Sequence, residues 1–310
     1  LPEQGKQYGR LIPCRALHRL RTRQETSELR YWLFLSAYDL QDKSLSNKLY
    51  LVYLLVFYGF LTLVGLAFFA QGASKSFLIM GISQPAPALA AAASICIGIA
   101  ALLQIWQAIQ SSPLRFSEAD RYQLCLQPLP KAFLILRWTW LPFIKTLLPL
   151  LLIFIFLGFS YAESLYPGLE FAAQFPAFFL AGLRMAIALI PWHLFFFLLS
   201  WVFGLLAQST SRPSLLLLPG LLMVLLFLLP DLLSFFPASG PPRLWALASD
   251  LPRLSAFFRL DLPWQPAILL WPTLLALLAV LLLCVFAPGF DPLKAAAQSV
   301  LETSVAELRR

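Results

Sequence analysis

Six long apolar runs dominate this sequence of 310 residues and restrict it to one class of fold. Each run reaches the roughly 20 residues that an α-helix needs to cross the ~30 Å hydrocarbon core of a bilayer. Lipid offers no hydrogen bonds to a polar backbone, so segments of this kind cross as helices. The sequence therefore predicts an all-α integral membrane protein with six transmembrane helices, at residues 50–70, 85–109, 138–160, 176–207, 214–236 and 266–287.

The overall composition excludes a soluble globular protein. Hydrophobic residues make up 60% of the chain and charged residues 12%, which is more apolar surface than one soluble core could hide. The runs divide the chain into three parts. We expect a cytoplasmic N-terminal segment at 1–49, a six-span transmembrane domain at 50–287 and a cytoplasmic C-terminal tail at 288–310.

The distribution of lysine and arginine predicts the orientation of these spans. Of the 23 cationic side chains, 17 fall in the two termini and in the segments 110–137 and 208–213, whereas 4 fall in the alternate loops. Cationic loops remain on the cytoplasmic side, so both termini are expected in the cytoplasm, with the protein in the plasma (inner) membrane. The net charge of +8 then reflects topology and contact with membrane lipid, and nucleic acid is not an expected partner.

Two segments outside the spans carry apolar residues in short helical patterns. In the N-terminal segment, Leu29, Trp32, Leu33, Ala37 and Leu40 recur at three- and four-residue spacing, which predicts an amphipathic helix lying at the membrane interface. A helix packed on a soluble partner is the alternative. Between the fifth and sixth spans, prolines divide residues 237–265 into pieces too short to cross. These pieces predict one or two extracytoplasmic helices, interfacial or partly re-entrant.

Motifs that carry catalysis are missing from the sequence. There is no G-x-x-x-x-G-K-[ST] loop for ATP, no H-E-x-x-H and no G-x-S-x-G elbow. The four cysteines are scattered, and only two histidines occur, so the spacing indicates neither a metal site nor a disulfide framework. We expect no catalytic residue, metal or cofactor in this chain, which argues against an intramembrane hydrolase or a prenyl-transferring enzyme.

Four polar side chains inside or beside the spans need an explanation, because burying them in lipid is costly. Lys145 lies about two turns into the third span, where its long side chain can reach back to the interface. Arg184 and Asp231 lie toward the outer ends of the fourth and fifth spans. They predict an ion pair or a cavity for an anionic headgroup, unless Arg184 reaches the outer surface. His193 follows Pro191 and either bonds a carbonyl freed by a kink or relays protons. Together, Arg184, Asp231 and His193 are the candidate residues of a translocation path.

The polar stretch between the second and third spans, SSPLRFSEADRYQLCLQPLPKAFLILR, has the features of a short rigid helix. Ser117 can cap free backbone amides, and Glu118 and Asp120 face the positive end of the helix dipole. Pro128 and Pro130 then end the helix, which we expect to run from Glu118 to Gln127. Such a helix could receive force from a soluble partner. The alternative is that it only ends one span and begins the next.

This stretch resembles the cytoplasmic loop of ABC-2-type exporter permeases, in which a P-L-x-F-S-x-A-D element leads into a short helix and a P-L-x-K/R turn. The matching positions are Pro113, Leu114, Phe116, Ser117, Ala119, Asp120, Pro128, Leu129 and Lys131. The layout of interfacial helix, six spans and coupling helix is also similar along the whole chain.

The resemblance implies a dimeric permease, formed with a second copy or a related chain and driven by a separate ATP-binding subunit that holds ATP and Mg²⁺. The residues expected to dock that ATPase are Ser117, Glu118, Asp120, Arg121, Tyr122 and Gln127. A different class of function, a non-transporting scaffold or anchor subunit of a larger membrane complex, is the alternative.

Overall fold

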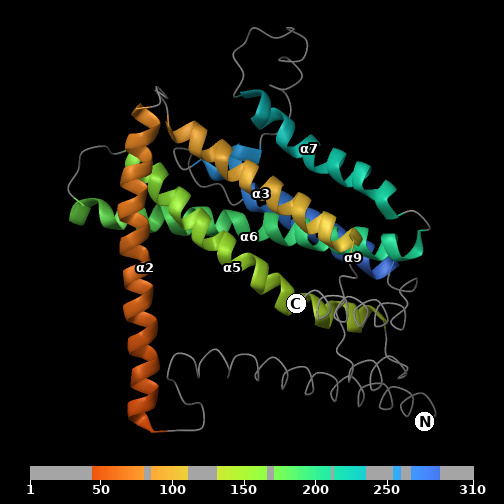
Figure 1. Ribbon diagram of the computed structural model, residues 1–310, viewed down its shortest axis with the longest axis horizontal. Helices are drawn as coiled ribbons and strands as arrows, with labels where there is room; N and C mark the ends of the chain where they lie inside the picture. Colours follow the sequence, from red (N-terminus) through yellow and green to blue (C-terminus); the bar gives the residue numbers. More distant parts are fainter. Residues whose placement is uncertain are drawn as a thin grey trace, which may run out of the picture.

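The computed structural model describes residues 44–79, 85–110, 131–165, 171–210, 213–234, 254–259 and 267–286. Within these ranges the chain is helical and contains no strand (Figure 1). The all-α prediction is therefore confirmed for the described part. The predicted N-terminal interfacial helix, the coupling helix and the C-terminal tail lie outside the described residues.

Six α-helices and two short 3-10 helices make up the described structure. The long helices are α2 (Leu45–Ile79), α3 (Pro85–Gln110), α5 (Lys131–Leu165), α6 (Phe171–Ser209), α7 (Leu217–Ser234) and α9 (Ala267–Phe286). The 3-10 helices are η1 (Pro213–Leu216) and η2 (Leu254–Phe258).

Five helices of the described part, α2 to α7, are long and apolar enough to cross a membrane. Such helices indicate a multi-pass membrane protein. The sixth predicted span corresponds to α9, whose apolar stretch, Leu270–Phe286, is shorter than that of the others. Five of the six expected spans thus correspond to helices long enough to cross a membrane, and the sixth corresponds to a helix with a shorter apolar stretch. Several helices also extend beyond the apolar runs, since α2 continues to Ile79 and α5 begins at Lys131.

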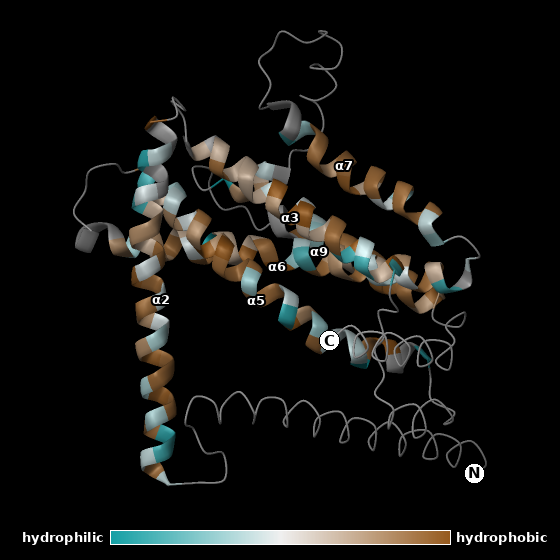
Figure 2. Ribbon diagram, in the orientation of Figure 1, coloured by the Kyte–Doolittle hydropathy of each residue, from teal (hydrophilic) through white to brown (hydrophobic). Residues whose placement is uncertain are grey.

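Helix α6 forms the centre of the bundle. It packs most extensively against α5, α9 and α3 (Figure 1). Within its apolar window 83% of the residues are buried, compared with 6% in the window of α2. Apolar residues occupy nearly every side of these helices (Figure 2), so hydropathy alone does not separate the faces that pack on protein from those that face lipid.

Small residues allow the helices to approach closely. A Cβ atom added to Gly158 of α5 would lie 2.7 Å from the carbonyl oxygen of Ala181 and 2.7 Å from the Cα atom of Gly182 in α6. On α3, a Cβ at Gly98 would lie 2.2 Å from the Leu228 side chain of α7. Lipid tails are as apolar as leucine, so helices in a bilayer associate through close packing of this kind.

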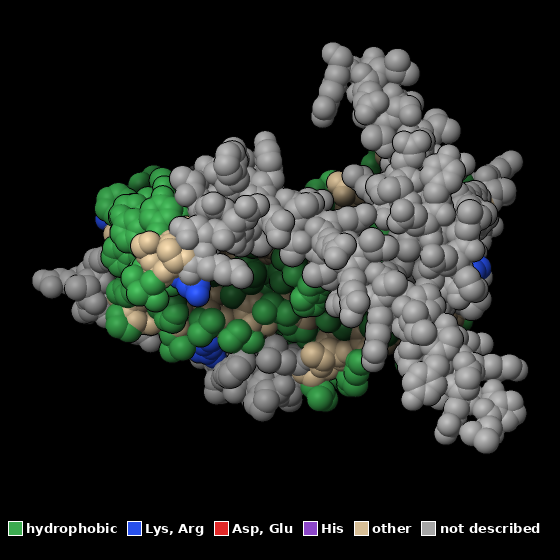
Figure 3. Space-filling view, turned by 90° about the horizontal axis from the view of Figure 1, so that it is seen from below, with side chains coloured by type: hydrophobic (Ala, Val, Ile, Leu, Met, Phe, Trp, Pro, Cys, Tyr) green, Lys and Arg blue, Asp and Glu red, His purple; other side chains and the backbone are tan. Residues whose placement is uncertain are grey.

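Helix α2 stands at the edge of the bundle. Its second half packs on the end of α5 through Leu63, Leu66, Ala67 and Ala70, which join a small cluster with Phe159 and Ala162. Its first half diverges from α5 and carries large exposed apolar side chains (Figure 1). Apolar side chains also cover most of the described surface seen from below, with few cations among them (Figure 3). Such a surface suits contact with lipid.

Candidate functional site

Most buried hydroxyl groups in the bundle bond to their own helix. The side chains of Ser94, Thr139, Ser160 and Ser200 each donate to a carbonyl three or four residues earlier, at 2.7 to 3.0 Å. This arrangement satisfies a hydroxyl in lipid without a partner on another helix. The contacts of Asp231 with Ser255 and of Thr146 with His193 instead join separate elements through side chains. We call the residues that make or adjoin them, Thr146, Trp192, His193, Asp231 and Ser255, the polar centre.

The first interaction joins the end of α7 to η2. The carboxylate of Asp231 is fully buried and accepts a 2.9 Å hydrogen bond from the Ser255 amide. It accepts a second bond, of 2.5 Å, from the Ser255 hydroxyl. The first amides of a helix have no partner within that helix, and a carboxylate is a strong acceptor for them. Asp231 therefore fixes η2 to α7 across 24 residues of chain.

The aromatic residues of η2 insert into the bundle core. Phe258 is fully buried, and its ring lies 5.2 Å from that of Phe154 on α5. Phe257 meets the indole of Trp192 edge-on at 5.1 Å, and Phe227 of α7 meets the same indole at 5.7 Å. Trp192 lies near the middle of the apolar window of α6, so η2 reaches the central level of that helix. The described part of the segment between α7 and α9, residues 254–259, thus packs inside the bundle.

Trp192 also has an unpaired donor. Its indole is 3% exposed, and its Nε1 atom has no hydrogen-bond partner among the described residues. A buried donor of this kind costs about 1 to 3 kcal/mol when left unpaired. The indole nitrogen is therefore a place where a water molecule or a polar group of a ligand would be stabilised.

The second interaction joins α6 to α5. The Nε2 atom of His193 lies 3.1 Å from the hydroxyl of Thr146, which also lies 3.0 Å from the Pro142 carbonyl. If the Thr146 hydroxyl donates to this carbonyl, its oxygen accepts from a protonated Nε2, so all three groups are satisfied. The imidazole also stacks on Phe143, with ring centroids 5.3 Å apart. His193 therefore contacts a side chain of the neighbouring helix, and its role at a kink or in a proton relay stays a prediction.

The three candidate path residues are not gathered at one point. Arg184 is half-buried on α6, nine residues before His193, which places the two on opposite faces of the helix. The Asp231 carboxylate bonds to Ser255. The predicted pairing of Arg184 with Asp231 stays a prediction. Lys145 is exposed on α5, and its reach toward the interface stays a prediction.

Sequence reasoning missed Ser255, Thr146, Trp192 and Glu163. Glu163 is 7% exposed near the end of α5, and its Oε2 atom has no hydrogen-bond partner in the described ranges. Lys75 on α2 is close enough to attract this carboxylate electrostatically. Glu163 is an isolated acid at the edge of an apolar run, and that isolation was the available signal. Nothing in the local pattern distinguishes Ser255 or Thr146 from other hydroxyl residues.

The polar centre joins α5 to α6 and α7 to η2. No group of three or more His, Cys, Asp and Glu side chains suited to a metal ion occurs in the part of the chain that the structure describes. The predicted docking residues, Ser117, Glu118, Asp120, Arg121, Tyr122 and Gln127, lie outside the described residues.

Comparison with known proteins gives no relative for this chain. No family model, no curated protein and no solved structure matches it.

Proposed function

We propose that this chain is the membrane-spanning permease subunit of an ATP-driven exporter of the ABC-2 type. The observation that carries the proposal is the sequence of the 111–137 loop, which contains a P-L-x-F-S-x-A-D element and the sequence signals of a capped helix ended by prolines. In this proposal α9 completes six spans, both termini are cytoplasmic, and two permease chains act together in the plasma membrane. ATP and Mg²⁺ are held by a separate subunit.

The arrangement of the helices supports a coupling role for this loop. The end of α3 and the beginning of α5, which the loop connects, lie toward the same end of the bundle as the end of α9 (Figure 1). Both α3 and α5 pack on the central helix α6. A push on the loop would therefore move two helices that contact the centre, and closure of the ATPase could be transmitted as a tilt of the spans.

The buried aromatic and polar contacts support an assignment of the path to the centre of the bundle. Asp231 and His193 lie buried on faces that contact other elements, and η2 fills the space beside Trp192. A path beside α6 would open when η2 leaves this position. Arg184, on the opposite face of α6 from His193, would then meet the cargo at a different point along α6.

Charge reversal in the loop tests the docking. In the variant Glu118→Lys with Asp120→Lys, we expect the ATPase subunit no longer to co-purify and its activity no longer to respond to substrate. The matched control is Glu302→Lys with Glu307→Lys in the C-terminal tail, which makes the same change of charge away from the loop. If the ATPase remains bound and coupled in the loop variant, the docking assignment is wrong. Recovery of redox or envelope-assembly subunits in place of an ATPase would favour the scaffold function.

Replacement of Arg184 tests the path. In Arg184→Leu we expect the complex to assemble and transport to fall, whereas Arg184→Lys should retain most transport because it keeps the positive charge. Normal transport by the leucine variant would show that Arg184 is not part of the path.

A further inference from the structure

The short helix η2 occupies a place among four long helices. It contacts α3, α6 and α7, and the ring of Phe258 lies 5.2 Å from that of Phe154 on α5. Phe258 is fully buried and Phe257 is half-buried. A helix of five residues is not stable by itself, so the position of η2 depends on the groups that surround it. The four helices therefore form a site, and η2 is the segment that occupies it.

This site combines a buried acceptor with aromatic walls. The fully buried Asp231 carboxylate accepts a 2.9 Å hydrogen bond from the Ser255 amide and a second, of 2.5 Å, from the Ser255 hydroxyl. Phe257 meets the Trp192 indole edge-on, with ring centroids 5.1 Å apart. Charged acceptors form strong hydrogen bonds, and edge-on ring pairs are a favoured aromatic geometry. The site thus suits two hydrogen-bond donors that are followed closely by two aromatic rings.

The η2 segment leaves one polar group of this site without a partner. The Trp192 indole is 3% exposed, and its Nε1 atom has no hydrogen-bond partner among the described residues. A ligand that brings an acceptor to this nitrogen gains a bond that η2 does not make, worth about 5- to 150-fold in affinity. That gain helps a free ligand to compete with η2, whose tether keeps it at a roughly millimolar effective concentration.

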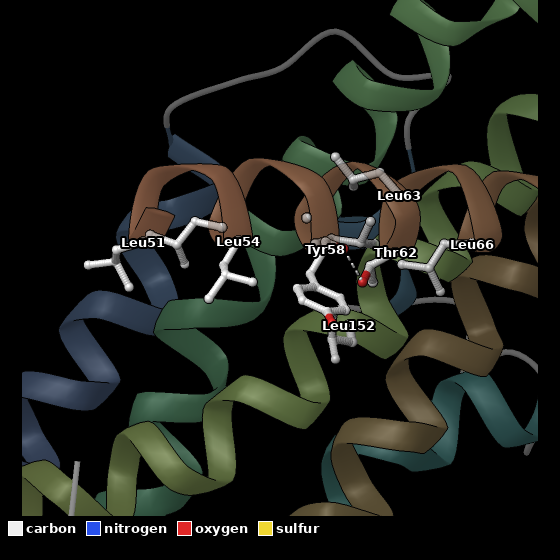
Figure 4. Close-up of a pocket in the computed structure, with 10 residues that line it drawn as sticks. Leu51, Leu54, Tyr58, Thr62, Leu63, Leu66 and Leu152 are labelled. Carbon is white, nitrogen blue, oxygen red and sulfur yellow. Dashed lines mark hydrogen bonds between the residues drawn. The ribbon is translucent and has the colours of Figure 1, made fainter. Parts of the chain in front are cut away.

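The apolar hollow beside α2 differs from the η2 site. Leucine side chains and Tyr58 of α2 line most of it, and α5 contributes Leu152 and Ile155 (Figure 4). The Thr62 hydroxyl in its wall already donates to the Tyr58 carbonyl at 2.7 Å. No charged residue lines this hollow, so it has no anionic acceptor for the donors of a ligand. It therefore serves as the comparison for the η2 site.

We propose that the place of η2 is a binding site for a short apolar peptide with two adjacent aromatic side chains, and that η2 fills this site when no peptide is bound. An amide and a hydroxyl of the peptide would donate to Asp231, and its rings would take the positions of Phe257 and Phe258. That the peptide is cargo rests on the proposed export function, whereas the binding itself does not.

A variant with an emptied site tests the binding. Phe257→Ala with Phe258→Ala removes both rings of η2 and keeps Asp231. The probe is a fluorescein-labelled peptide amide, Leu-Ser-Ala-Phe-Phe, which has the sequence of residues 254–258. Fluorescence anisotropy measures its binding to the purified full chain in nanodiscs, with empty nanodiscs as the blank. We expect saturable binding, about tenfold tighter than to the unmodified chain, because the tethered rings no longer compete.

Matched controls determine where the peptide binds. The peptide Leu-Ser-Ala-Ala-Ala lacks both rings and should bind about tenfold more weakly. Adding Asp231→Ala to the emptied variant should weaken binding of the aromatic peptide about tenfold, because the change removes the acceptor of both donors. Adding Gly59→Leu instead should leave binding unchanged. No atom lies within 4 Å of a Cβ placed on Gly59, so that leucine enters the hollow beside α2.

The unmodified chain provides a second measurement if the emptied variant fails to fold. At about 1 mM aromatic peptide, which matches the effective concentration of a tethered segment, we expect faster hydrogen exchange at residues 254–258. The alanine peptide should leave this exchange unchanged. Because neither measurement includes an ATPase, its result is independent of the docking test.

Four outcomes would overturn the proposal. The first is a folded emptied variant that does not bind the aromatic peptide saturably, or that binds both peptides alike. The second is unchanged binding after Asp231→Ala. The third is loss of binding after Gly59→Leu, which would place the peptide in the hollow beside α2. The fourth, decisive where the emptied variant does not fold, is unchanged exchange at residues 254–258 of the unmodified chain.

Discussion

Replacing Asp231 by alanine tests whether the carboxylate holds η2 in the bundle. The change removes both acceptors of Ser255 and leaves its amide and hydroxyl unpaired where η2 meets the bundle. Hydrogen bonds to a charged group contribute about 1.5 to 3 kcal/mol each, and part of that gain is offset because the variant no longer buries a charge. We expect local opening of η2 to become easier by about 2 to 4 kcal/mol, which corresponds to a roughly 30- to 700-fold larger open population.

Hydrogen exchange of peptides that cover 254–258 measures this opening directly, because the Ser255 amide is itself bonded to Asp231. Exchange should accelerate strongly in Asp231→Ala and less in Asp231→Asn, since the amide oxygen of asparagine still accepts one bond. Ser200→Ala is the control, because its hydroxyl is buried but bonds only to the Phe197 carbonyl of its own helix. Equal exchange rates at 254–258 in Asp231→Ala and the unmodified chain would refute the assignment.

Three further predictions concern packing within the bundle, and thermal unfolding in detergent micelles measures each of them. Gly158→Ala should lower the free energy of unfolding by about 1 to 3 kcal/mol, because its Cβ would meet the backbone of α6. The control Gly72→Ala should leave the free energy of unfolding unchanged or raise it. Equal effects of the two changes would contradict the close contact at Gly158. Thr146→Val should lower the free energy of unfolding by about 1 to 3 kcal/mol because it removes the hydroxyl that His193 Nε2 contacts, and adding His193→Phe should recover much of this loss. Additive losses would show that the two residues are not coupled. Trp192→Phe removes an indole donor that has no partner among the described residues. The free energy of unfolding should therefore fall by less than the roughly 3 to 5 kcal/mol usual for losing a large aromatic side chain. A larger fall would indicate that a water or ligand bonds the indole.

The sequence alone was sufficient to predict helices and their approximate positions. A run of apolar residues long enough to cross a bilayer can satisfy its backbone only as a helix, so residues 85–109 indicated α3 (Pro85–Gln110) with little room for error. The same argument could not give the ends of α5 or α2. Both helices continue beyond the lipid-soluble run, where helix propensity and packing determine the boundary.

The contacts between helices were decided only by the tertiary structure. Residues such as Ser255 and Thr146 acquire their roles from Asp231 and His193, which lie 24 and 47 positions away, and no local pattern records such a distance. Apolar residues cover every side of the helices, so the periodicity that reveals a buried face in soluble proteins is nearly absent. The central place of α6 and the edge position of α2 are therefore properties of the assembled bundle, as is the close approach of α5 and α6 at Gly158 and Gly182.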